Sequence, residues 1–367
     1  MGGRASPEML AWQALLIEKG YSARTIPRDY GGHGGEPDIL ETIILAEEFA
    51  RAGVPAGVSG PGVDMLVPTL LAHGTEEQKR RWIAPTIRGE LVWCQGYSEP
   101  GSGSDLASLQ TAAVEDGDEL VINGQKTWTS SAQVADMMFA LVRTERGEAR
   151  HAGLSYVLIP MDAPGVEVRP LRTMTGQEEF NQVFFSDVRI PLANVVGRRG
   201  GGWEIASTTL KHERLVAGSP RELESTLQSL VALLQGEMRN GVRAIDDPLL
   251  RDRLLRLQAR VLTLKCHAMR LLTCDLRGES PGVAGLVVKL QACELMHQMA
   301  ALALDAMGDL GALYHGSKYE RALGAWQTAH MTWIGFIIAG GTAQIQKNII
   351  SERGLGLPRE PKLAAGK

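Results

Sequence analysis

The chain has 367 residues, of which 38 are Lys or Arg and 42 are Asp or Glu, so its formal net charge is −4 and its pI is about 6.1. With 44% hydrophobic residues, it has the composition of a globular protein of roughly two or three domains. This size excludes a small scaffold held by disulfides or zinc. The near-neutral charge, without a basic run rich in aromatics, argues against nucleic acid as a partner.

The cysteines and the longest apolar stretch predict the cellular compartment of the protein. None of the cysteines belongs to a CxxC pair or lies at a metal-ligand spacing, so we expect buried free thiols in a reducing compartment. Residues 333–340 (WIGFIIAG) are far shorter than the roughly 20 apolar residues that a membrane span needs. With a composition rich in Ala, Leu, Gly and Arg, this predicts a cytoplasmic, bacterial protein without a membrane span. The cysteines are Cys94, Cys266, Cys274 and Cys293.

The first part of the chain has the pattern of several short helices. Ser6 is suited to cap a helix that stops at Gly20. Thr75, followed three residues later by Gln78, is a capping-box signature that predicts another helix start. We therefore predict an N-terminal helical domain at residues 1–90.

The pattern then changes to short β-rich runs separated by turn signals. Two of these runs, ELVING and QKTWTS, meet at Asn123-Gly124, a dipeptide typical of hairpin turns. A strand-built middle domain is therefore predicted at residues 91–197. Its other β-rich runs are residues 111–114, 137–142, 155–160 and 166–171.

Long amphipathic stretches follow, and their short connections favour an antiparallel four-helix bundle at residues 198–367. The tail from residue 358 (PREPKLAAGK) is expected to be disordered. The fold class predicted for the chain is α+β, mostly α. The expected long helices are residues 203–235, 248–277, 283–307 and 318–338.

Several segments could form a functional site, and each also has an ordinary structural explanation. The loop at 97–105 (YSEPGSGSD) offers backbone N–H groups to an anion, but it is also a common turn sequence. Residues 340–342 (GGT) precede a helix, where N–H groups favour phosphate or carbonyl oxygen, or they form a plain connection. Trp128 could stack on a planar cofactor or belong to the core. Glu213 could be a solvated charge on a helix.

Other chemistries lack the residues that they need. The chain has no GxxxxGK loop and no GxGxxG after a strand, so the usual glycine loops for nucleotide phosphates are missing. It has no legible Ser-His-Asp or Cys-His constellation, and its histidines show no HxxxH or HExxH spacing. Hydrolase chemistry is therefore not predicted.

Five segments lie along nearly the whole chain: TIPRDYGG (25–32), WCQGYSEPGSGSDLASLQT (93–111), INGQKTWTSSA (122–132), FFSDVRIPLANVVG (184–197) and GGTAQIQKNIISERGLGLPRE (340–360). They resemble, in the correct order, segments of the acyl-CoA dehydrogenase family of flavoproteins. The family fold is an N-terminal helical domain, a middle β-barrel-like domain and a C-terminal four-helix bundle, which agrees with the order predicted above. The resemblance implies FAD-dependent α,β-dehydrogenation of an acyl-CoA thioester to the trans-2-enoyl-CoA.

The resemblance further implies that FAD lies between the middle and C-terminal domains. Ser98 would lie near the flavin N5 edge, and Ser104 near both the pyrophosphate and the substrate. In the family a neighbouring subunit reaches the adenine end, so segments 305–309 and 341–344 carry over as dimer-dependent contacts. The cofactor residues implied are Gln95, Tyr97, Ser98, Gly103, Ser104, Trp128, Thr129, Ser130, Asp305, Gly308, Asp309, Gly341, Thr342 and Gln344.

The family's reaction requires a carboxylate base, because an α-proton must leave while a hydride passes to the flavin. Many members carry this glutamate immediately before the C-terminal Gly-Thr, where this chain has Gly340. The isovaleryl and long-chain branches place it on the first long helix of the C-terminal domain, before an arginine. Glu213 and Arg214 match that position, so Glu213 is the expected base. Ser104, Arg214 and Gly340 are the expected substrate contacts.

The resemblance implies an electron acceptor but leaves the assembly open. It implies an electron-transferring flavoprotein as acceptor, a role in fatty acid or lipid β-oxidation, and a homo-oligomer such as a dimer or homotetramer. The family's Arg-x-Thr-Phe-Gly contact to the partner's FAD is missing, and Arg243 is only a weak substitute. A hetero-oligomer with a homologue, in which the partner completes the FAD site, is therefore an alternative. A flavin oxidase or monooxygenase on the same fold is another.

Overall fold

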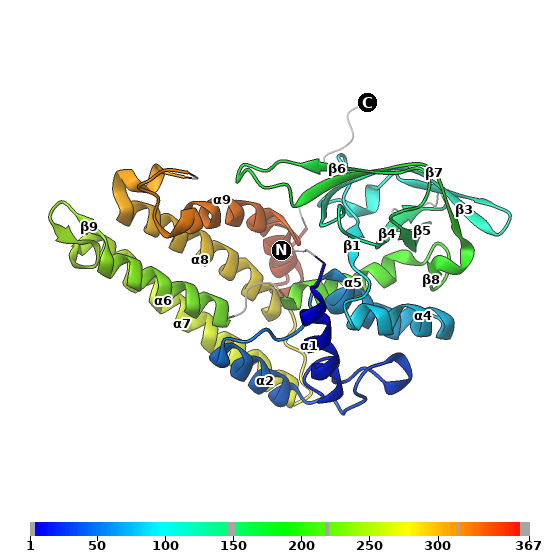
Figure 1. Cartoon of the computed structure of the whole chain (residues 1–367), viewed down its shortest axis with the longest axis horizontal. Coiled ribbons are helices and arrows are strands. Elements are labelled where there is room, and N and C mark those ends of the chain that lie inside the picture. Colours follow the sequence, from blue (N-terminus) through cyan, green and yellow to red (C-terminus); the bar gives the residue numbers. More distant parts are fainter. Residues whose placement is uncertain (1–3, 146–150, 217–219, 315, 360–367) are drawn as a thin grey trace. The chain divides into compact units, whose positions relative to one another are not determined.

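The computed structural model describes residues 4–145, 151–216, 220–314 and 316–359, and the side chains of residues 213–216 are outside this description. The chain divides into two compact units, Met1–Leu215 and Val216–Lys367, which are drawn in Figure 1. Each unit is described by itself.

The first unit begins with helices whose ends follow the predicted signals. The Met9 N–H donates to Ser6 Oγ at 3.3 Å, which caps the first helix. Thr75 and Gln78 form the reciprocal capping box expected for the fourth. Both helix starts are confirmed. The helices are α1 (Pro7–Glu18), α2 (Ile39–Ala52), α3 (Val67–His73) and α4 (Glu76–Ile87).

The strands of the first unit form a mostly antiparallel sheet with the order β6-β7-β3-β2-β4-β5-β8, and β1 pairs in parallel with β4. Figure 1 shows these strands in cyan and green. The strands are β1 (Trp93–Gly96), β2 (Ala112–Asp116), β3 (Glu119–Ser130), β4 (Met137–Arg143), β5 (Leu154–Pro160), β6 (Val166–Leu171), β7 (Phe180–Pro191) and β8 (Val195–Val196).

The turn expected at Asn123-Gly124 is wrong, because β3 runs through both residues. The side-chain amide of Asn123 donates to Asp187 Oδ1, and its oxygen accepts from the Asp187 N–H, both at 2.9 Å. The pairing of β3 with β7 shifts here, because β7 has one extra residue near Asp187. The chain reverses instead at Gly117-Asp118, where Gly117 has a φ of +66°.

Strands β4 and β5 are buried on both faces, which accounts for their nearly continuous apolar sequences. Phe139 of β4 belongs to a hydrophobic cluster that also contains Ile83 of α4 and Ile205 of α5 (Gly202–Val216). The next residue, Met138, belongs to a second cluster with Ile122 of β3. Alternate side chains of one strand therefore pack against the helices and against the rest of the sheet.

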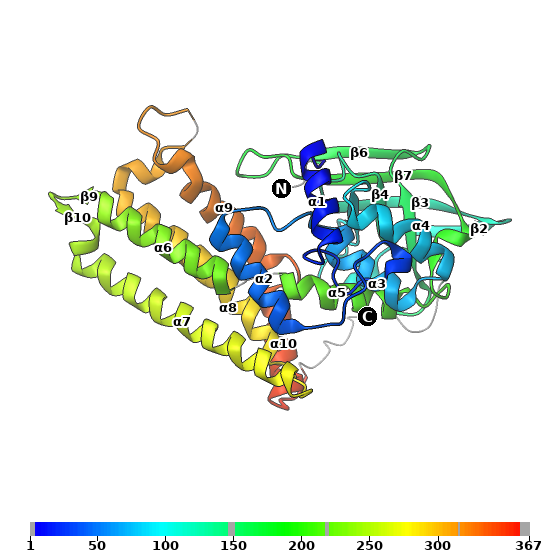
Figure 2. The same ribbon diagram turned by 60° about the horizontal axis from the view of Figure 1, so that its bottom comes forward.

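The second unit consists mainly of helices. Helix α8 is buried along most of its length and contacts α6, α7 and α9, and Figure 2 shows these helices side by side. The apolar core of the second unit is one cluster built from these helices, including Leu230, Leu257 and Leu302. The elements are α6 (Pro220–Gly236), β9 (Met238–Arg239), β10 (Val242–Arg243), α7 (Pro248–Leu276), α8 (Ala284–Met307), α9 (Ala325–Ile338) and α10 (Ala343–Ile349).

Two of the expected long helices have different bounds. The stretch 203–235 is divided into α5, which packs in the first unit, and α6, which begins with Pro220 at its first position. The stretch 318–338 becomes helical only from Ala325, after residues at positive φ such as Leu323 (+53°). The tail from residue 360 lies outside the described residues.

The predicted fold class is confirmed: a helical N-terminal domain, a β-sheet middle domain and a helical C-terminal domain, mostly α-helical overall. The boundaries at residues 90 and 197 stay a prediction. Within the part of the chain that the structure describes, no helix combines the length and the apolar character that crossing a membrane requires.

Candidate active site

The loop at residues 97–105 begins in the core and ends at the surface. The Tyr97 ring is buried and makes edge-on contacts with Phe139 and Tyr156. Glu99 and Ser102 then exchange two backbone hydrogen bonds of 2.9 and 3.0 Å, which close a tight turn. Gly103 and Ser104 are exposed, while Gln95 in β1 and Ser98 after it are half-buried. Of the predicted contacts, Gln95, Ser98, Gly103 and Ser104 therefore keep accessible surface, whereas the side chain of Tyr97 is buried.

A buried ion pair, which the sequence reasoning missed, fixes this loop to β3. The ammonium group of Lys126 donates to Glu99 Oε1 at 2.8 Å and to the Tyr97 carbonyl at 3.2 Å. The Glu99 carboxylate also accepts from the backbone N–H groups of Gln110 and Thr111 at 2.6 and 2.9 Å. A lysine at an inward-facing position of a strand was the signal available in the sequence, because such a charge needs a partner.

Burial and pairing act against each other in this ion pair. Burial lowers the pKa of Lys126 to about 8, although Glu99 opposes the shift. Burial also favours the protonated form of Glu99, but Lys126 and the hydrogen bonds from Thr111 and Gln110 outweigh it and hold the pKa of Glu99 below its ordinary value. Both side chains are therefore charged at neutral pH.

The second predicted cofactor segment lies on a bulge in β3. Pairing with β7 shifts between Lys126 and Thr129, where β3 has one extra residue, and Trp128 has a φ of +59°. The indole is 61% exposed and meets Phe180 edge-on at 6.0 Å. The alternative that Trp128 belongs to the core is therefore wrong, because the bulge turns its side chain outward.

Buried polar atoms lie beside the exposed indole. Thr129 Oγ1 and Asn181 Oδ1 are buried and have no hydrogen-bond partner among the described residues. Thr129 and Asn181 are also paired across β3 and β7. The Thr127 N–H donates to the Ser98 carbonyl at 2.9 Å and so joins the two predicted cofactor segments. Ser130, the last predicted contact of this segment, is exposed. An exposed aromatic face with unsatisfied polar atoms fits a flat, polar-edged cofactor such as a flavin.

In the second unit, the glycine loop before α10 is held by another buried lysine. The ammonium group of Lys289 donates to the carbonyls of Ala339 and Gly341 at 2.7 and 2.9 Å. Gly340 and Gly341 have φ of +60° and +91°, which favours glycine at both positions. Thr342 Oγ1 accepts from the Ile345 N–H at 3.1 Å and caps α10. Lys289, on α8, is a second anchoring residue that the sequence reasoning missed.

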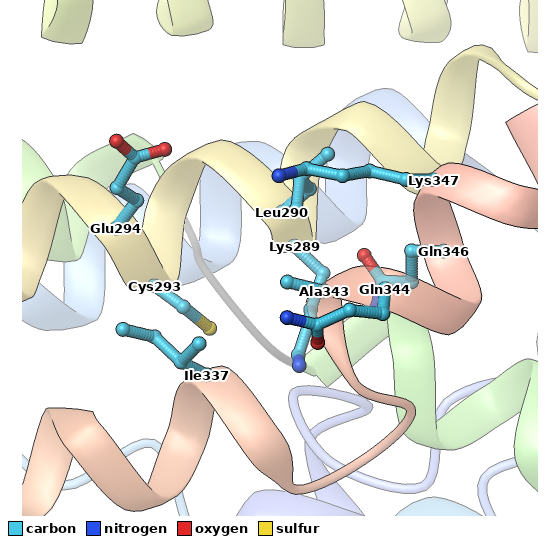
Figure 3. A pocket seen from close by; sticks show the side chains of 9 residues that line it. All are labelled: Lys289, Leu290, Cys293, Glu294, Ile337, Ala343, Gln344, Gln346 and Lys347. Atoms are coloured by element: carbon cyan, nitrogen blue, oxygen red, sulfur yellow. The ribbon is translucent and has the colours of Figure 1, made fainter. Parts of the chain in front are cut away.

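A cavity of about 260 Å³ lies beside this loop. Figure 3 shows Cys293 pointing toward Ile337, with Lys289 beside Ala343 and Gln344. Burial raises the pKa of the Cys293 thiol, Lys289 opposes this and nearby Glu222 adds to it. Burial likewise raises the pKa of Glu222, although the residue keeps accessible surface. Glu222, on α6, is thus a carboxylate with a raised pKa that the sequence reasoning did not single out.

The remaining predicted contacts in the second unit lie at the far end of α8. Asp305 Oδ2 accepts from Arg253 at 2.6 Å, and the Asp305 carbonyl accepts from Arg239 at 3.2 Å. Asp305, Gly308 and Asp309 are exposed. Lys289 lies in the second turn of α8 and Asp305 in the last, so they are separated by roughly 24 Å. The structure therefore keeps the two predicted adenine-end segments apart.

The expected base and its neighbour, Glu213 and Arg214, lie on α5, and their side chains are outside the described residues. The helix before them is held firmly, because Thr209 Oγ1 is 2.9 Å from Thr69 Oγ1 and Thr208 Oγ1 is 2.8 Å from His73 Nε2. Burial, together with the positive charge of Lys211, lowers the pKa of His212. This end of α5 is therefore partly enclosed.

Two other expectations concern cysteines and the weak substitute Arg243. Cys94 and Cys293 are buried as expected, but Cys266 is exposed and Cys274 is partly exposed; all four are free. The burial expected of Cys266 is wrong because it lies on the outward face of α7. Arg243 is exposed and donates to Asp246 Oδ2 at 2.8 Å. Among the described residues, no cluster of His, Cys, Asp and Glu is suited to hold a metal.

Comparison with known protein families places this architecture in one class. The profile of the acyl-CoA dehydrogenase N-terminal domain matches residues 3–90, the middle-domain profile residues 94–188, and the C-terminal-domain profile residues 200–355. The chain belongs to the acyl-CoA dehydrogenase family, as its motifs predicted. It is an oxidoreductase that dehydrogenates a CH–CH bond of an acyl-CoA, and FAD is the cofactor that this family implies.

Similar proteins include enzymes and two-component complexes. The chain is 41% identical to acyl-CoA dehydrogenase IpdE1 of Mycobacterium tuberculosis (strain ATCC 25618 / H37Rv) over 364 aligned residues. The alignment covers 98% of this chain and 90% of IpdE1. The solved Tcur3481-Tcur3483 steroid ACAD has a TM-score of 0.83 at 30% identity, covering 98% of this chain and 91% of that one. The ChsE4-ChsE5 complex from Mycobacterium tuberculosis has a TM-score of 0.82 at 33% identity, covering 97% and 94%. Relatives of this chain thus form hetero-oligomers.

Proposed function

We propose that this chain binds FAD through the exposed surface around Trp128 and dehydrogenates an acyl-CoA thioester, with Glu213 as the base. The observation that carries the proposal is the exposed indole beside the unsatisfied Thr129 Oγ1, joined to the loop of Ser98 by the hydrogen bond from Thr127. FAD, when bound, accepts the hydride that leaves the β-carbon of the substrate. The polar contacts proposed for it in the first unit are Gln95, Tyr97, Ser98, Gly103, Ser104, Thr129 and Ser130.

The second unit supplies further proposed cofactor contacts from two separate ends of α8. Near Lys289, the contacts are Gly341, Thr342 and Gln344; at the far end they are Asp305, Gly308 and Asp309. Because the two ends are roughly 24 Å apart, we propose that they do not reach the same end of one dinucleotide. One set serves a cofactor of the same chain, and the other a cofactor held by a neighbouring subunit.

In the proposed mechanism, Glu213 removes the α-proton of the thioester. Its carboxylate needs a raised pKa to do so, and enclosure away from water supplies that rise. Burial of the adjacent His212, whose lowered pKa favours the neutral ring, supports such an environment. Ser104 and Arg214 orient the substrate, and Gly340 leaves open the space that a glutamate occupies in many relatives.

For the substrate and partner we propose a bulky, ring-bearing acyl-CoA of steroid origin and a second, homologous subunit. Similarity to a steroid ACAD and to the ChsE4-ChsE5 complex supports both. An electron-transferring flavoprotein is the proposed acceptor, and a β-oxidation sequence in the bacterial cytoplasm is the proposed setting. A homotetramer is the alternative assembly.

An anaerobic flavin titration tests this function. Purified protein is mixed with straight-chain, branched and polycyclic acyl-CoA thioesters while the flavin absorbance is recorded. We expect bleaching by the polycyclic class, and a rate of bleaching that falls about 10²–10⁴-fold in Glu213→Gln while the FAD content is kept. Glu204→Gln, an exposed glutamate on the same helix, is the matched control.

Three outcomes would contradict the proposal in different ways. Unchanged bleaching by Glu213→Gln, with loss in Glu222→Gln, would move the base to Glu222. A yellow protein that no thioester bleaches, but that consumes oxygen, would favour an oxidase or monooxygenase. A colourless protein that binds FAD only with a second subunit would show that this chain alone has an incomplete cofactor site.

A further inference from the structure

Helix α5, which carries Glu213, meets strand β5 at two points. At its start, the backbone of Gly202 lies so close to β5 that a Cβ atom there would stand 2.6 Å from the Ser155 carbonyl carbon and from the Tyr156 nitrogen. About two helical turns further on, Thr209 Oγ1 lies 3.3 Å from the Tyr156 hydroxyl oxygen. The first two turns of α5 therefore run along one tyrosine, from its backbone to its hydroxyl group.

The contact between Thr209 and Tyr156 belongs to a buried row of hydroxyl groups. Thr209 Oγ1 is also 2.9 Å from Thr69 Oγ1 on α3. The Thr69 hydroxyl donates to the Met65 carbonyl at 2.7 Å, in the turn that precedes α3. Thr69, Thr209 and Tyr156 are all fully buried. Strand β5, α5 and α3 are thus joined by polar contacts that are shielded from solvent.

The ring of Tyr156 packs against the start of the loop at residues 97–105, which is proposed to hold the flavin. It meets the Tyr97 ring edge-on, with 6.4 Å between the ring centroids, and Ser98 follows Tyr97 directly. It also stacks on the Phe139 ring, parallel within 1° at 6.0 Å. One aromatic side chain therefore contacts the flavin loop through its ring and the helix of Glu213 through its hydroxyl group.

Packing alone does not require the hydroxyl group of Tyr156. Phe139 is buried to the same extent in the same apolar cluster, and it has no hydroxyl group. A buried hydroxyl group costs free energy unless it is hydrogen-bonded, and the contact with Thr209 meets that requirement. Burial raises the pKa of Tyr156, so the group keeps its proton at neutral pH. The hydroxyl group is therefore explained by what it holds rather than by the core.

We propose that Tyr156 and Thr209 are positioning residues that set the place of Glu213 relative to the flavin loop. Thr209 lies one helical turn before Glu213, so its anchoring fixes the turn to which the base belongs. The inference rests on the dehydrogenation proposed above. Proton removal and hydride transfer occur at neighbouring carbons, so base and flavin must keep a fixed separation, and an error of about 1 Å costs up to about 10²-fold in rate.

The experiment removes the hydroxyl groups in Tyr156→Phe and Thr209→Val and restores one in Thr209→Ser. Flavin reduction by the thioester that bleaches the unmodified protein is followed anaerobically, in flavin-loaded protein with any subunit that FAD binding requires. We expect the limiting rate to fall about tenfold in Tyr156→Phe and Thr209→Val, with unchanged FAD content and an apparent substrate affinity within about twofold. Thr209→Ser should recover most of the rate.

Thr86→Val is the matched control, because it removes another buried hydroxyl group from a helix of the same unit. Thr86, on α4, donates to the Trp82 carbonyl at 2.6 Å and accepts from the Trp93 indole at 2.8 Å, without contact to α5. Its loss should lower the urea midpoint about as much as Thr209→Val does but leave the limiting rate unchanged. An equal fall in rate would mean that Thr209 acts only through general stability.

An unchanged limiting rate in both Tyr156→Phe and Thr209→Val would overturn the proposal, and so would a fall that Thr209→Ser does not recover. If no thioester reduces the flavin of the unmodified protein, the proposed function fails, and hydrogen exchange then decides the anchoring by itself. The amides of α5 around Thr209 should exchange faster in Tyr156→Phe and Thr209→Val than in Thr209→Ser and Thr86→Val. Equal exchange in all four would contradict the anchoring.

Discussion

Two buried lysines, one in each unit, hold the two loops that are expected to meet the cofactor. In the sheet, Lys126 shares its ammonium group between the Tyr97 carbonyl and the carboxylate of Glu99. In the helical unit, Lys289 donates to the carbonyls of Ala339 and Gly341. The first loop is thus held mainly by an opposite charge, and the second by backbone dipoles.

This difference affects how much each lysine contact contributes to stability and how that contribution changes with pH. A buried cation facing a full negative charge is lost at high cost, because removing either partner leaves the other charged and dehydrated. The carbonyls of Ala339 and Gly341 carry no net charge, so removing Lys289 leaves these two acceptors unpaired but uncharged. Loss of the Glu99 carboxylate should therefore destabilise the chain more than loss of the two carbonyl contacts of Lys289. The carboxylate also makes the sheet anchor sensitive to acid.

The largest effect is expected from Glu99→Gln, which leaves the fully buried Lys126 without its carboxylate. We expect the free energy of unfolding to fall by about 3–5 kcal/mol, with loss of bound FAD as the 97–105 loop loosens. Urea denaturation checks the first effect and flavin absorbance the second. Glu167→Gln, which removes an exposed partner of Arg169, should change the free energy of unfolding very little. A similar cost for both variants would contradict the anchoring role.

Acid should weaken the sheet anchor selectively. Because the pKa of Glu99 in the folded chain lies below its ordinary value of 4.5, the unfolded chain takes up a proton there first as the pH falls. The stability that Glu99 contributes is therefore complete above that ordinary value and is lost as the pH drops below it. As the pH falls from 7 to 3.5, the difference in urea midpoint between the unmodified chain and Glu99→Gln should become smaller. A constant gap would contradict the shifted pKa.

A smaller effect is expected for Lys289→Met. The change keeps an apolar chain in the core but leaves the carbonyls of Ala339 and Gly341 without this donor, at a cost of about 1–3 kcal/mol. The matched control is Lys347→Met, an exposed lysine on the rim of the same cavity, which should change stability by less than about 0.5 kcal/mol. An equal loss of stability in Lys289→Met and Lys347→Met would contradict the anchoring role of Lys289.

The smallest effect on stability is expected for Trp128→Ala, because the indole is mostly exposed and contacts chiefly Phe180. We expect a change of about 1 kcal/mol or less in the free energy of unfolding, but a roughly tenfold weaker affinity for FAD from lost stacking. Flavin fluorescence titration measures the affinity. Tyr319→Ala, an exposed aromatic in the second unit, is the control. Unchanged FAD affinity in Trp128→Ala would mean that the bulge has another role.

Local signals predicted much of the fold. The capping box of Thr75 and Gln78 and the apolar runs of β4 and β5 are decided by residues close in the sequence, so they could be recognised there. Asn123-Gly124 is typical of a hairpin turn but lies within β3, because the side chain of Asn123 bonds to a bulge in β7 more than sixty residues away. Pro220 indicates that the stretch 203–235 is not one helix, because proline is favoured at the first position of a helix.

The sequence by itself determined the family, the order of helices and strands, and most of the candidate cofactor residues, because these depend on short motifs and on periodicity. Only the tertiary structure decided that Trp128 faces outward and that Lys126 and Lys289 hold the two loops. Each of these depends on a strand register or on a contact between distant residues. Burial and pairing determine how much such residues contribute to stability, and both are present only in the folded chain.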